Sequence, residues 1–393
     1  MVDETAPIGI GVIGFGWMGR VHTTAYTRVG HHYPLARRPR LVAVADEVPG
    51  RADQAAAAYG FERATNDWRS LLDAPDISAV SITAPNFAHR EIGEAFAAAG
   101  KHIWIEKPVG VTADDAAAVR DAVRAAGVQS AVGFNYRNAP AVEELRRRIA
   151  DGEIGEITHA SFRMLGDYAA DASGAFTWRY ELARAGHGVL GDLASHAVDL
   201  VRHLLGEIDE VVADGAIFVP RRRRPSGVVT GHERVSDGEL VDVENEDWVS
   251  AILRLSSGAR VTLEASRVAV GHQNDYGVRI HGTRGVLEWD FRRMGELVEA
   301  AGDAVQDLPL ATRFVGTQSG DLARFQPGGA LALSYDDLKV VEAERFLRSI
   351  VTGQPVGAVI DDAVAAAVVI DALAESTRTR RWTSVGTAIE AAR

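Results

Sequence analysis

Ile8-Gly9-Ile10-Gly11-Val12-Ile13-Gly14-Phe15-Gly16-Trp17-Met18-Gly19 is the stretch that decides the fold of the first part of the chain. Its first six residues read as a strand buried on both faces of a parallel sheet, and a helix is predicted over residues 17–26. Between them, Gly14 permits a tight turn, Gly16 lets the backbone approach a pyrophosphate, and Gly19 lets the helix pack closely on the strand. Because a helix N-terminus offers free N–H groups to phosphates, we predict a dinucleotide-binding pocket here.

Asp46 stands at the carboxyl end of a second strand, predicted over residues 41–45. A carboxylate there accepts hydrogen bonds from the adenosine ribose and repels a 2′-phosphate, so we expect NAD to be preferred over NADP. Glu47 adds negative charge, and the nearest following cation, Arg51, is several residues further on. Asp46 is unusually far along the sequence from the glycines, and we interpret residues 28–40 as an inserted loop that lengthens the connection. The arginines of this loop, Arg37, Arg38 and Arg40, are the one source of positive charge that could favour NADP instead.

Strands and helices continue to alternate up to residue 135. Strands are predicted over residues 77–82, 102–105 and 129–132, and helices over residues 88–99 and 111–126. This alternation predicts an α/β domain with a doubly wound parallel sheet, whose ligands bind beyond the carboxyl ends of the strands. Three polar residues fall just after such ends: Asn86, Lys107 and Asn135.

The pattern changes after Pro140. Short connections between the later strands predict an α+β domain with a large, open, mostly antiparallel sheet. We therefore divide the chain into a Rossmann domain over residues 1–138 and a second domain over residues 139–393. Its predicted strands cover residues 157–164, 211–219, 247–255, 260–268, 278–281 and 286–290, and its helices residues 141–150, 336–351 and 361–379. An open sheet leaves a face that needs cover, so we expect a homo-oligomer.

Asp192 and His196 lie four residues apart in a helix predicted over residues 188–205, so both side chains project from one face. An imidazole can accept an alcohol proton at neutral pH, as oxidation to a ketone requires. Lys107 follows a strand and precedes Pro108, and its ammonium can stabilise charge on a substrate oxygen. The alternatives are a surface Asp–His pair and a solvated lysine.

The chain resembles the glucose–fructose oxidoreductase, inositol dehydrogenase and rhizopine catabolism (Gfo/Idh/MocA) family over nearly its whole length. Besides the glycine turn, the motifs that carry the resemblance are Ala84-Pro85-Asn86-Phe87-Ala88-His89, Glu106-Lys107-Pro108, Gly133-Phe134-Asn135-Tyr136-Arg137 and the helix with Asp192 and His196. Trp178-Arg179, before the turn Gly186-His187-Gly188, is similar to the inositol and levoglucosan dehydrogenase branch. The resemblance implies an NAD(P)-dependent oxidoreductase of a small polyhydroxylated substrate, a sugar or cyclitol, that assembles as a homodimer or homotetramer.

The resemblance also implies a role for each site residue. Lys107, Asp192 and His196 form the catalytic set and bind substrate together with Tyr136 and His187. For His187, which stands where a small residue is usual, a side chain that points to solvent is the alternative. Ala84 stands where the family often has threonine. The implied cofactor contacts are Gly14, Phe15, Gly16, Met18, Gly19, Asp46, Pro85, Asn86, His89, Glu106, Asn135, Arg137, Trp178 and Arg179.

Composition excludes several other classes of protein. The 393 residues are 47% hydrophobic and 24% charged, as in globular domains, and a net charge of −12 argues against a nucleic-acid partner. The one dense basic run, Arg221 to Arg224, is read as a solvated loop. Without cysteine there is no disulfide or thiolate metal site, and we expect no metal. The acidic N-terminus and the lack of a long apolar run predict a cytoplasmic protein that neither carries a signal peptide nor spans a membrane.

Two other functions fit the same fold. An NAD-dependent glycosidase oxidises its substrate transiently, eliminates and reduces again, so it cleaves a glycoside without net NADH. An NAD-sensing regulatory protein binds without catalysis, but it has little reason to keep both Lys107 and His196.

Overall fold

The computed structural model describes residues 6–386, apart from residues 228, 230 and 232. The chain forms two compact units: Met1–Asn135 with Ser334–Val364, and Tyr136–Leu333 with Ala365–Arg393. The predicted division was a single cut at residue 138, so the segment Ser334–Val364 joins the first unit instead of the second. The N-terminal residues used against a signal peptide, 1–5, lie outside the described residues.

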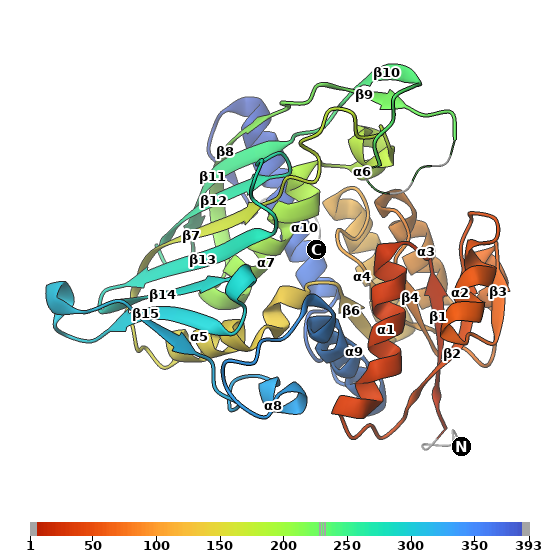
Figure 1. The fold of residues 1–393 in the computed structure, drawn as a ribbon, viewed down its shortest axis with the longest axis horizontal. Coiled ribbons are helices and arrows are strands. Elements are labelled where there is room, and N and C mark those ends of the chain that lie inside the picture. The colour runs from red at the N-terminus through yellow and green to blue at the C-terminus, as the bar shows by residue number, and fades with distance from the viewer. Residues whose placement is uncertain (1–5, 228, 230, 232, 387–393) are drawn as a thin grey trace. The chain divides into compact units, whose positions relative to one another are not determined.

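The first unit is built on a six-stranded parallel sheet with the order β3-β2-β1-β4-β5-β6 (Figure 1). Val12, Val44 and Ile105 are fully buried, as expected of a sheet with both faces covered. The strands are β1 Ile8–Ile13, β2 Pro39–Ala45, β3 Arg63–Thr65, β4 Ala79–Ile82, β5 His102–Ile105 and β6 Ser130–Val132. The predicted doubly wound sheet is confirmed, with most strand ends within two residues of their predicted positions.

Helix α1 is longer than the sequence indicated, because it runs over Trp17–His32. The prediction that residues 28–40 form an inserted loop is therefore wrong for residues 28–32, and also for residues 39–40, which begin β2. Tyr26 and Val29 are buried on the inner face of the helix, and no proline interrupts the chain before Pro34, so the helix continues. The other helices of this part of the chain are α2 Arg51–Tyr59, α3 Asn86–Ala98 and α4 Ala113–Ala126.

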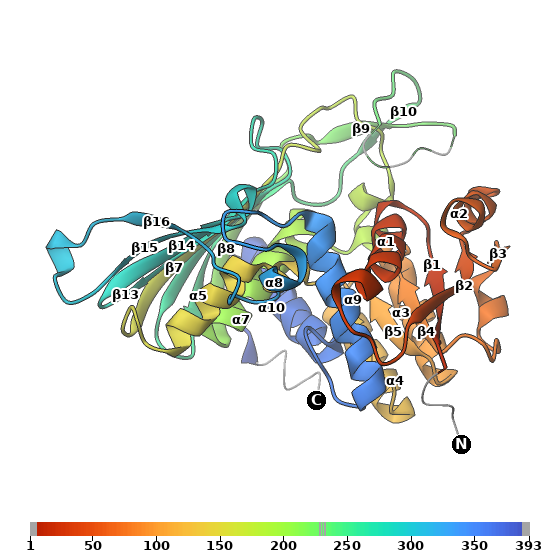
Figure 2. The same ribbon diagram turned by 60° about the horizontal axis from the view of Figure 1, so that its bottom comes forward.

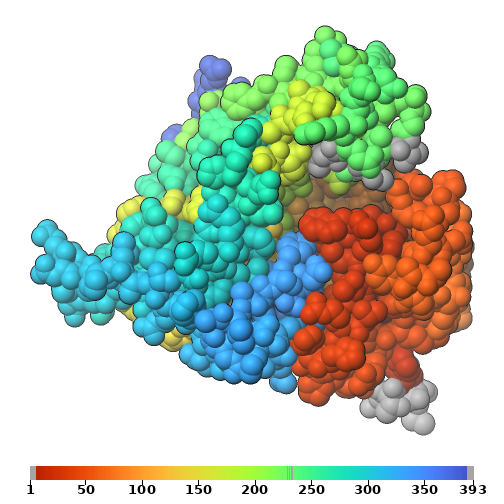
Figure 3. Space-filling model, viewed as in Figure 1, coloured from red at the N-terminus to blue at the C-terminus, as the bar shows by residue number. Residues whose placement is uncertain are grey.

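Helix α9, Tyr335–Thr352, completes the first unit by packing against α1. Ser334 begins it with a capping box, in which its hydroxyl accepts from the Asp337 N–H and the Asp337 carboxylate accepts from Ser334. The Trp17 and Tyr335 rings stack at 5.3 Å, and Figure 3 shows the blue residues of this segment against the red residues of α1. Beyond α9, the Val132 N–H donates to the Ala358 carbonyl at 3.0 Å, which ties the segment to the edge of the sheet.

The second unit contains a nine-stranded sheet with the order β16-β15-β14-β13-β7-β12-β11-β8-β17. Only the β7–β12 pair is parallel among these strands, so the predicted mostly antiparallel sheet is confirmed. Val261 and Leu263 of β12 are buried and Thr262 and Glu264 are exposed, so this sheet is covered on one face. Figure 2 shows α5 (Pro140–Ala150) and α7 (Ser195–Leu205) on the covered face.

The remaining elements have these bounds. The strands are β7 Ile157–Leu165, β8 Ile208–Ala216, β9 Arg221–Arg224, β10 Glu239–Asp242, β11 Trp248–Leu255, β12 Arg260–Ser266, β13 Asp275–Gly282, β14 Gly285–Asp290, β15 Glu296–Ala301, β16 Ala311–Phe314 and β17 Thr383–Ser384. The helices are α6 Leu182–Ala185, α8 Leu322–Phe325 and α10 Ile360–Thr379. Among the residues that the structure describes, no helix is both long and apolar enough to cross a membrane.

The basic run Arg221 to Arg224 is a strand, and its prediction as a solvated loop is wrong. It forms β9, which pairs with β10. Arg222 is buried, its guanidinium lies 4.5 Å from the centre of the Tyr180 ring, and it donates to the Asp171 carbonyl at 2.8 Å. Arg222 therefore fixes a loop and the aromatic cluster beneath it.

Candidate active site

The glycine turn after β1 has the geometry that a pyrophosphate site needs. Gly14 has a φ of +86°, and a Cβ there would lie 2.8 Å from the Ala84 Cα. A Cβ at Gly19 would lie 2.4 Å from the Gly14 carbonyl oxygen, so the helix can approach the strand only with glycine. At Gly16 a Cβ would meet no described atom within 4 Å, and no described side chain caps the first N–H groups of α1. The turn thus leaves open space beside free backbone donors, which fits a dinucleotide phosphate.

Asp46 is held on several sides at the end of β2. Its Oδ2 accepts from the Phe15 N–H at 2.6 Å and its Oδ1 from the Val48 N–H at 2.9 Å. The Phe15 ring packs on Tyr59, with ring centroids 5.5 Å apart. One Arg51 guanidinium nitrogen lies 3.3 and 3.4 Å from the two Asp46 oxygens. Arg51, which the sequence placed several residues away, is therefore the cation that contacts this carboxylate.

Arg37, Arg38 and Arg40, around the start of β2, contact other parts of the chain. The Arg37 Nε donates to the Ala6 carbonyl at 2.6 Å, and Arg40 donates to Glu62 at 2.6 Å. A methyl group at Gly30 would lie 3.2 Å from Arg38, which places that guanidinium beside α1. The local charge around the expected adenosine ribose site is therefore set by Asp46 and Arg51.

The segment after β4 holds the glycine turn in place. The Thr83 hydroxyl, next to Ala84, lies 3.2 Å from the Ile13 carbonyl and also donates to Gly14. His89 is buried, with one ring nitrogen 2.8 Å from the Pro108 carbonyl and the other 2.7 Å from the Ala84 carbonyl. His89 thus lies between the loop after β4 and the loop after β5, and a neutral ring, which has one N–H, donates to one of the two carbonyls at a time. Pro85 precedes α3, and Asn86 is its first residue.

Glu106 and Lys107 directly follow β5, and Asn135 lies shortly after β6. Because the strands are parallel, these residues, Asp46 and Gly14 all belong to one edge of the sheet. The Asn135 amide is fully buried, and neither its nitrogen nor its oxygen has a hydrogen-bond partner among the described residues. An unpaired buried amide is costly unless a ligand satisfies it, so Asn135 fits the edge of a cofactor site.

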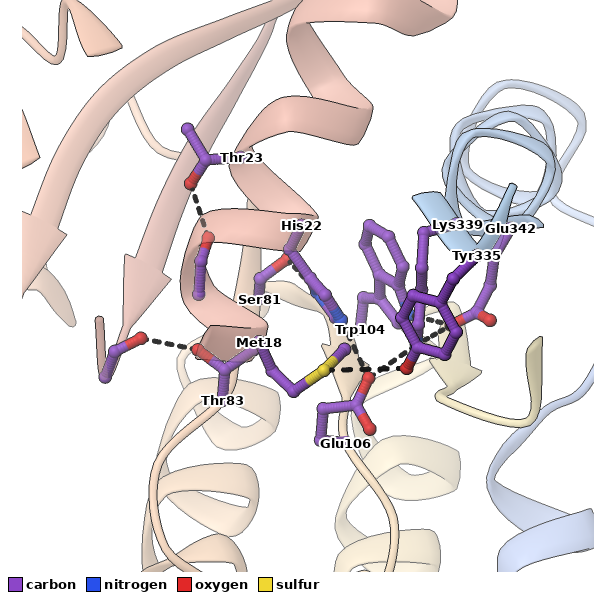
Figure 4. Close-up of polar contacts among 12 residues, drawn as sticks. Met18, His22, Thr23, Ser81, Thr83, Trp104, Glu106, Tyr335, Lys339 and Glu342 are labelled. Carbon is purple, nitrogen blue, oxygen red and sulfur yellow. Dashed lines mark hydrogen bonds and ion pairs between the residues drawn. The ribbon is translucent and has the colours of Figure 1, made fainter. Parts of the chain in front are cut away.

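A buried charged network lies beneath this edge (Figure 4). The Lys339 ammonium donates to Glu106 Oε1 at 2.5 Å and to Glu342 Oε1 at 3.1 Å. His22 Nε2 lies 2.9 Å from Glu106 Oε1, and Trp104 Nε1 donates to Glu342 Oε1 at 2.5 Å. Candidate metal-ligand atoms of His22, Glu106 and Glu342 lie within 4.8 Å of one another, but Lys339 already supplies positive charge to both carboxylates.

The protonation states in the network follow from its geometry. Burial lowers the pKa of His22 to about 4, so its ring is neutral, and the pKa of Glu106 lies well below its usual value. Burial opposes that decrease in Glu106, but Lys339 and His22 outweigh it. His22 must then donate from Nε2 to Glu106 and accept at Nδ1 from the Ser81 hydroxyl, 3.2 Å away. Ser81 in turn accepts from the Tyr26 hydroxyl at 3.0 Å, which gives the chain of hydrogen bonds one direction.

In the second unit, Asp192 lies in the turn that leads into α7, and His196 lies in the first turn of α7. Residues Leu190–Ala194 form a π-helical turn, which replaces the regular α-helix predicted from residue 188. Glu246 holds the start of this turn, since its carboxylate accepts from the Leu190 N–H and its carbonyl from the Val189 N–H, both at 2.9 Å. A Cβ at Gly188 would lie 2.1 Å from the Glu246 carbonyl oxygen, which accounts for the glycine.

Two tyrosines that sequence reasoning did not single out lie beside Asp192. The Tyr168 hydroxyl donates to Asp192 Oδ2. Burial and then the Asp192 charge raise the pKa of Tyr168 well above its usual value, and they raise that of Tyr276 as well. The Tyr136 ring lies 4.6 Å from His196 and 5.6 Å from Tyr276. Tyr168 belongs to the loop after β7, and no local pattern marks it as a partner of Asp192.

Other residues expected at the site have structural partners in the second unit. Arg137 donates its Nε to Asp199 at 2.8 Å, in a buried two-point ion pair with α7. Arg179 lies over the Trp178 ring at 4.5 Å.

His187 contacts α10 instead of pointing only to solvent, because its Nε2 lies 3.0 Å from Asp371. Burial lowers the pKa of His187, but Asp371 and Glu246 outweigh burial and leave it raised.

Fold and site together define a dinucleotide-binding oxidoreductase of the Rossmann class. Two family models match the chain: "Oxidoreductase family, NAD-binding Rossmann fold" over residues 8–134 and "GFO/IDH/MocA C-terminal domain" over residues 142–288. The chain is 35% identical to levoglucosan dehydrogenase of Pseudarthrobacter phenanthrenivorans, over 96% of this chain and 98% of that protein. It is 29% identical to inositol 2-dehydrogenase of Rhizobium meliloti, over 96% and 99% of the two chains.

Solved structures give the same result. A levoglucosan dehydrogenase in complex with NADH and levoglucosan matches with a TM-score of 0.90 and 34% identity, over 96% of this chain and 99% of that one. The chain belongs to the Gfo/Idh/MocA family and is an NAD-binding oxidoreductase, as its sequence motifs predicted.

The buried network predicts a pH-dependent stability. Burial, together with the charge of Glu106, raises the pKa of Glu342 to about 7, although Lys339 opposes the shift. A carboxyl group whose pKa is raised on folding contributes stability at low pH, and this contribution is lost as the pH rises through about 7. The melting temperature of Glu342→Gln minus that of the wild type should therefore be about 5 °C higher at pH 8 than at pH 5.

Thermal unfolding at the two pH values measures this difference. Glu94→Gln, at a partly exposed glutamate of α3, serves as the control, and its difference from the wild type should not change with pH. An equal difference for Glu342→Gln at both pH values would show that Glu342 is ionised throughout.

Proposed function

We propose that this chain oxidises a secondary alcohol of a cyclic polyol or sugar to a ketone, with NAD as the acceptor. The observation that carries the proposal is the position of Lys107, which follows β5 at the sheet edge that also holds the glycine turn and Asp46. Levoglucosan and inositol dehydrogenases among the similar proteins support a substrate of this class. Proposed cofactor contacts at this edge are Gly14, Phe15, Gly16, Met18, Gly19, Asp46, Pro85, Asn86, Glu106 and Asn135.

Two side chains carry the proton transfer and the charge stabilisation in this proposal. His196 takes the proton of the reacting hydroxyl as the general base. Lys107 donates a hydrogen bond to the same oxygen and stabilises its developing negative charge. Bound NAD supplies the acceptor for the hydride that leaves the carbon, so the C–H and O–H bonds break as the C=O bond forms.

Asp192 orients the substrate and the imidazole. The hydrogen bond from Tyr168 supports this role, because a neutral tyrosine hydroxyl fixes the direction of the carboxylate. Tyr136, against the His196 ring, and His187 are the proposed further substrate residues. His89 and Arg137 act as positioning groups, since both are engaged with the protein itself.

A substrate screen tests the function. Purified protein with NAD is offered inositols, levoglucosan and common aldoses while the absorbance of NADH is followed. Formation of NADH with at least one cyclic polyol or sugar is expected. Cleavage of a glycoside without net NADH, or binding of NADH without turnover of any polyol, would contradict the proposal and favour the glycosidase or the sensor.

Removal of the proposed catalytic groups should abolish most turnover. Lys107→Ala and His196→Ala should each lower kcat by about 10²–10⁴-fold, the usual contribution of an acid–base group, with little effect on NADH affinity. Steady-state kinetics and NADH fluorescence measure the two quantities. Lys101→Ala and His31→Ala are matched controls. Near-full activity of His196→Ala would show that another group accepts the proton.

Cofactor preference should depend on Asp46, with NAD used more efficiently than NADP. Asp46→Ser removes the carboxylate that repels a 2′-phosphate and releases Arg51, which can then bind that phosphate. We expect the ratio of kcat/KM for NADP to that for NAD to rise by about tenfold or more, because one charge-assisted hydrogen bond contributes about that much.

Two further variants test whether the gain in NADP use depends on Arg51. Arg51→Ala in the Asp46→Ser background should remove the gain, and Arg40→Ala, at an arginine paired with Glu62, should leave the ratio unchanged. Equal or better use of NADP by the wild-type protein would show that Asp46 does not select the cofactor.

The exposed face of the nine-stranded sheet supports a proposed homodimer or homotetramer. Ile252 of β11 is 42% exposed on this face, between buried neighbours on either side in the strand. Light scattering at micromolar concentration should give at least twice the chain mass of 42.1 kDa. Ile252→Arg should lower that mass, and Leu310→Arg, at an exposed residue outside the sheet, should not. A monomeric wild-type mass would refute the proposal.

A further inference from the structure

Lysine is rare in this chain, and its positions are informative. Of the 42 lysine and arginine residues only three are lysines: Lys101, Lys107 and Lys339. Arginine therefore serves as the general cation of this protein. Lys101 donates to the carbonyls of Ala74 and Ile77 at 2.8 and 2.9 Å, at the other end of β5 from Lys107. Lys339 is the third, and its side chain is fully buried.

The surroundings of Lys339 require a compact cation. Its ammonium lies between the Glu106 and Glu342 carboxylates and 5.6 Å from the centre of the Trp104 ring. Figure 4 shows the side chain descending from α9 toward Glu106 beside this ring. An ammonium is a compact point charge, whereas a guanidinium is larger and planar and needs partners in its own plane. Arginine is not an equivalent residue at this position.

The network holds only one half of the Glu106 carboxylate. Oε1 accepts from Lys339 and from His22, at 2.5 and 2.9 Å. The hydrogen bonds that the described residues make to the Glu106 side chain both end on Oε1, and Oε2 lies against Gly133, where a Cβ would be 2.4 Å away. A carboxylate with one oxygen bound twice by the protein and the other bound by no described residue can accept a hydrogen bond from a ligand at that second oxygen.

The position of Glu106 indicates which part of the ligand it meets. In the strand order, β2 with Asp46 lies on one side of β1, and β4 and β5 with Glu106 lie on the other. A dinucleotide crosses such a sheet at β1, where the strand order reverses, with one mononucleotide over each half. Since Asp46 marks the adenosine half, Glu106 belongs to the nicotinamide half.

We propose that Lys339 is a positioning residue for the cofactor: it fixes Glu106 through Oε1 so that Oε2 accepts a hydrogen bond from the nicotinamide half of the bound dinucleotide. Lys339 itself does not touch the cofactor. The inference rests on the dinucleotide site of the proposed function and is independent of the substrate. In this role Lys339 does more than neutralise two buried carboxylates, because it also sets the position of the one that meets the cofactor.

The wild-type protein allows a direct test by NMR. The chain has three lysines, so labelling their Nζ atoms with ¹⁵N gives only three side-chain signals to assign. Lys101→Met and Lys107→Met identify the signals of those two lysines, so the remaining signal is that of Lys339. On addition of saturating NADH without substrate, the Lys339 signal should shift because its partner Glu106 gains a ligand, and the Lys101 signal should not. A Lys339 signal that stays unchanged while NADH fluorescence reports full binding would overturn the proposal.

A double-mutant cycle tests the same link through affinity. Lys339→Met removes the charge at similar volume and should weaken NADH binding by about tenfold, with Lys101→Met as the matched control. In the Glu106→Gln background the same substitution should cost little further affinity, because Lys339 acts through Glu106. An undiminished effect in that background, or an effect no larger than that of Lys101→Met, contradicts the positioning role. If Lys339→Met does not fold, the wild-type measurement decides.

The two proposals fail in different ways. NADH binding with the expected lysine shift but no turnover of any polyol would refute the proposed function and leave the role of Lys339 intact. Turnover of a polyol with an unmoved Lys339 signal would refute only the positioning role.

Discussion

The common direction of the six strands in the first unit is the constraint on which the binding site depends. Parallel strands all end at one edge, so the residues that follow them gather there, although they come from segments dispersed along the chain. Gly14, Asp46, Glu106 and Asn135 are brought together in this way. The apolar runs of β1, β2, β4 and β5 are buried on both faces, and only the residues after the strands are free to carry chemistry.

The buried network is the feature that departs most from an ordinary apolar core. Isolated buried charges are costly, and this network reduces the cost by sharing one ammonium between two carboxylates and by matching donors to acceptors along Tyr26, Ser81 and His22. This pairing of donors with acceptors leaves Glu342 Oε2 without a partner among the described residues. Such an arrangement stabilises less than an apolar core of similar volume, so its presence beneath a ligand-binding edge suggests that it serves binding and not only folding.

Local sequence patterns predicted the helices and strands and the candidate site residues that follow the strands, because apolar runs, glycines and strand ends are local features. Residues that act through partners distant in the sequence were missed. Lys339 and Glu106 are separated by 233 positions, and in the sequence Lys339 is one charged residue on a helix that reads as amphipathic. Arg51 contacts Asp46 because α2 begins directly after the loop that follows β2, which was not predicted. Arg222 is buried because a strand pair and Tyr180 enclose it, and composition alone indicated a loop.

The discontinuity of the first unit also changes what the family match describes. The two matched ranges, residues 8–134 and 142–288, cover the parallel sheet and most of the second sheet, but neither includes α9. Yet α9 packs on α1, the helix whose N-terminus faces the pyrophosphate site, and it supplies the ammonium that holds Glu106. Without α9, Glu106 would keep only the neutral His22 as a partner, and its carboxylate would tend to take up a proton. An ionised, oriented Glu106 therefore requires a segment that enters the unit some 200 residues after the sheet is complete.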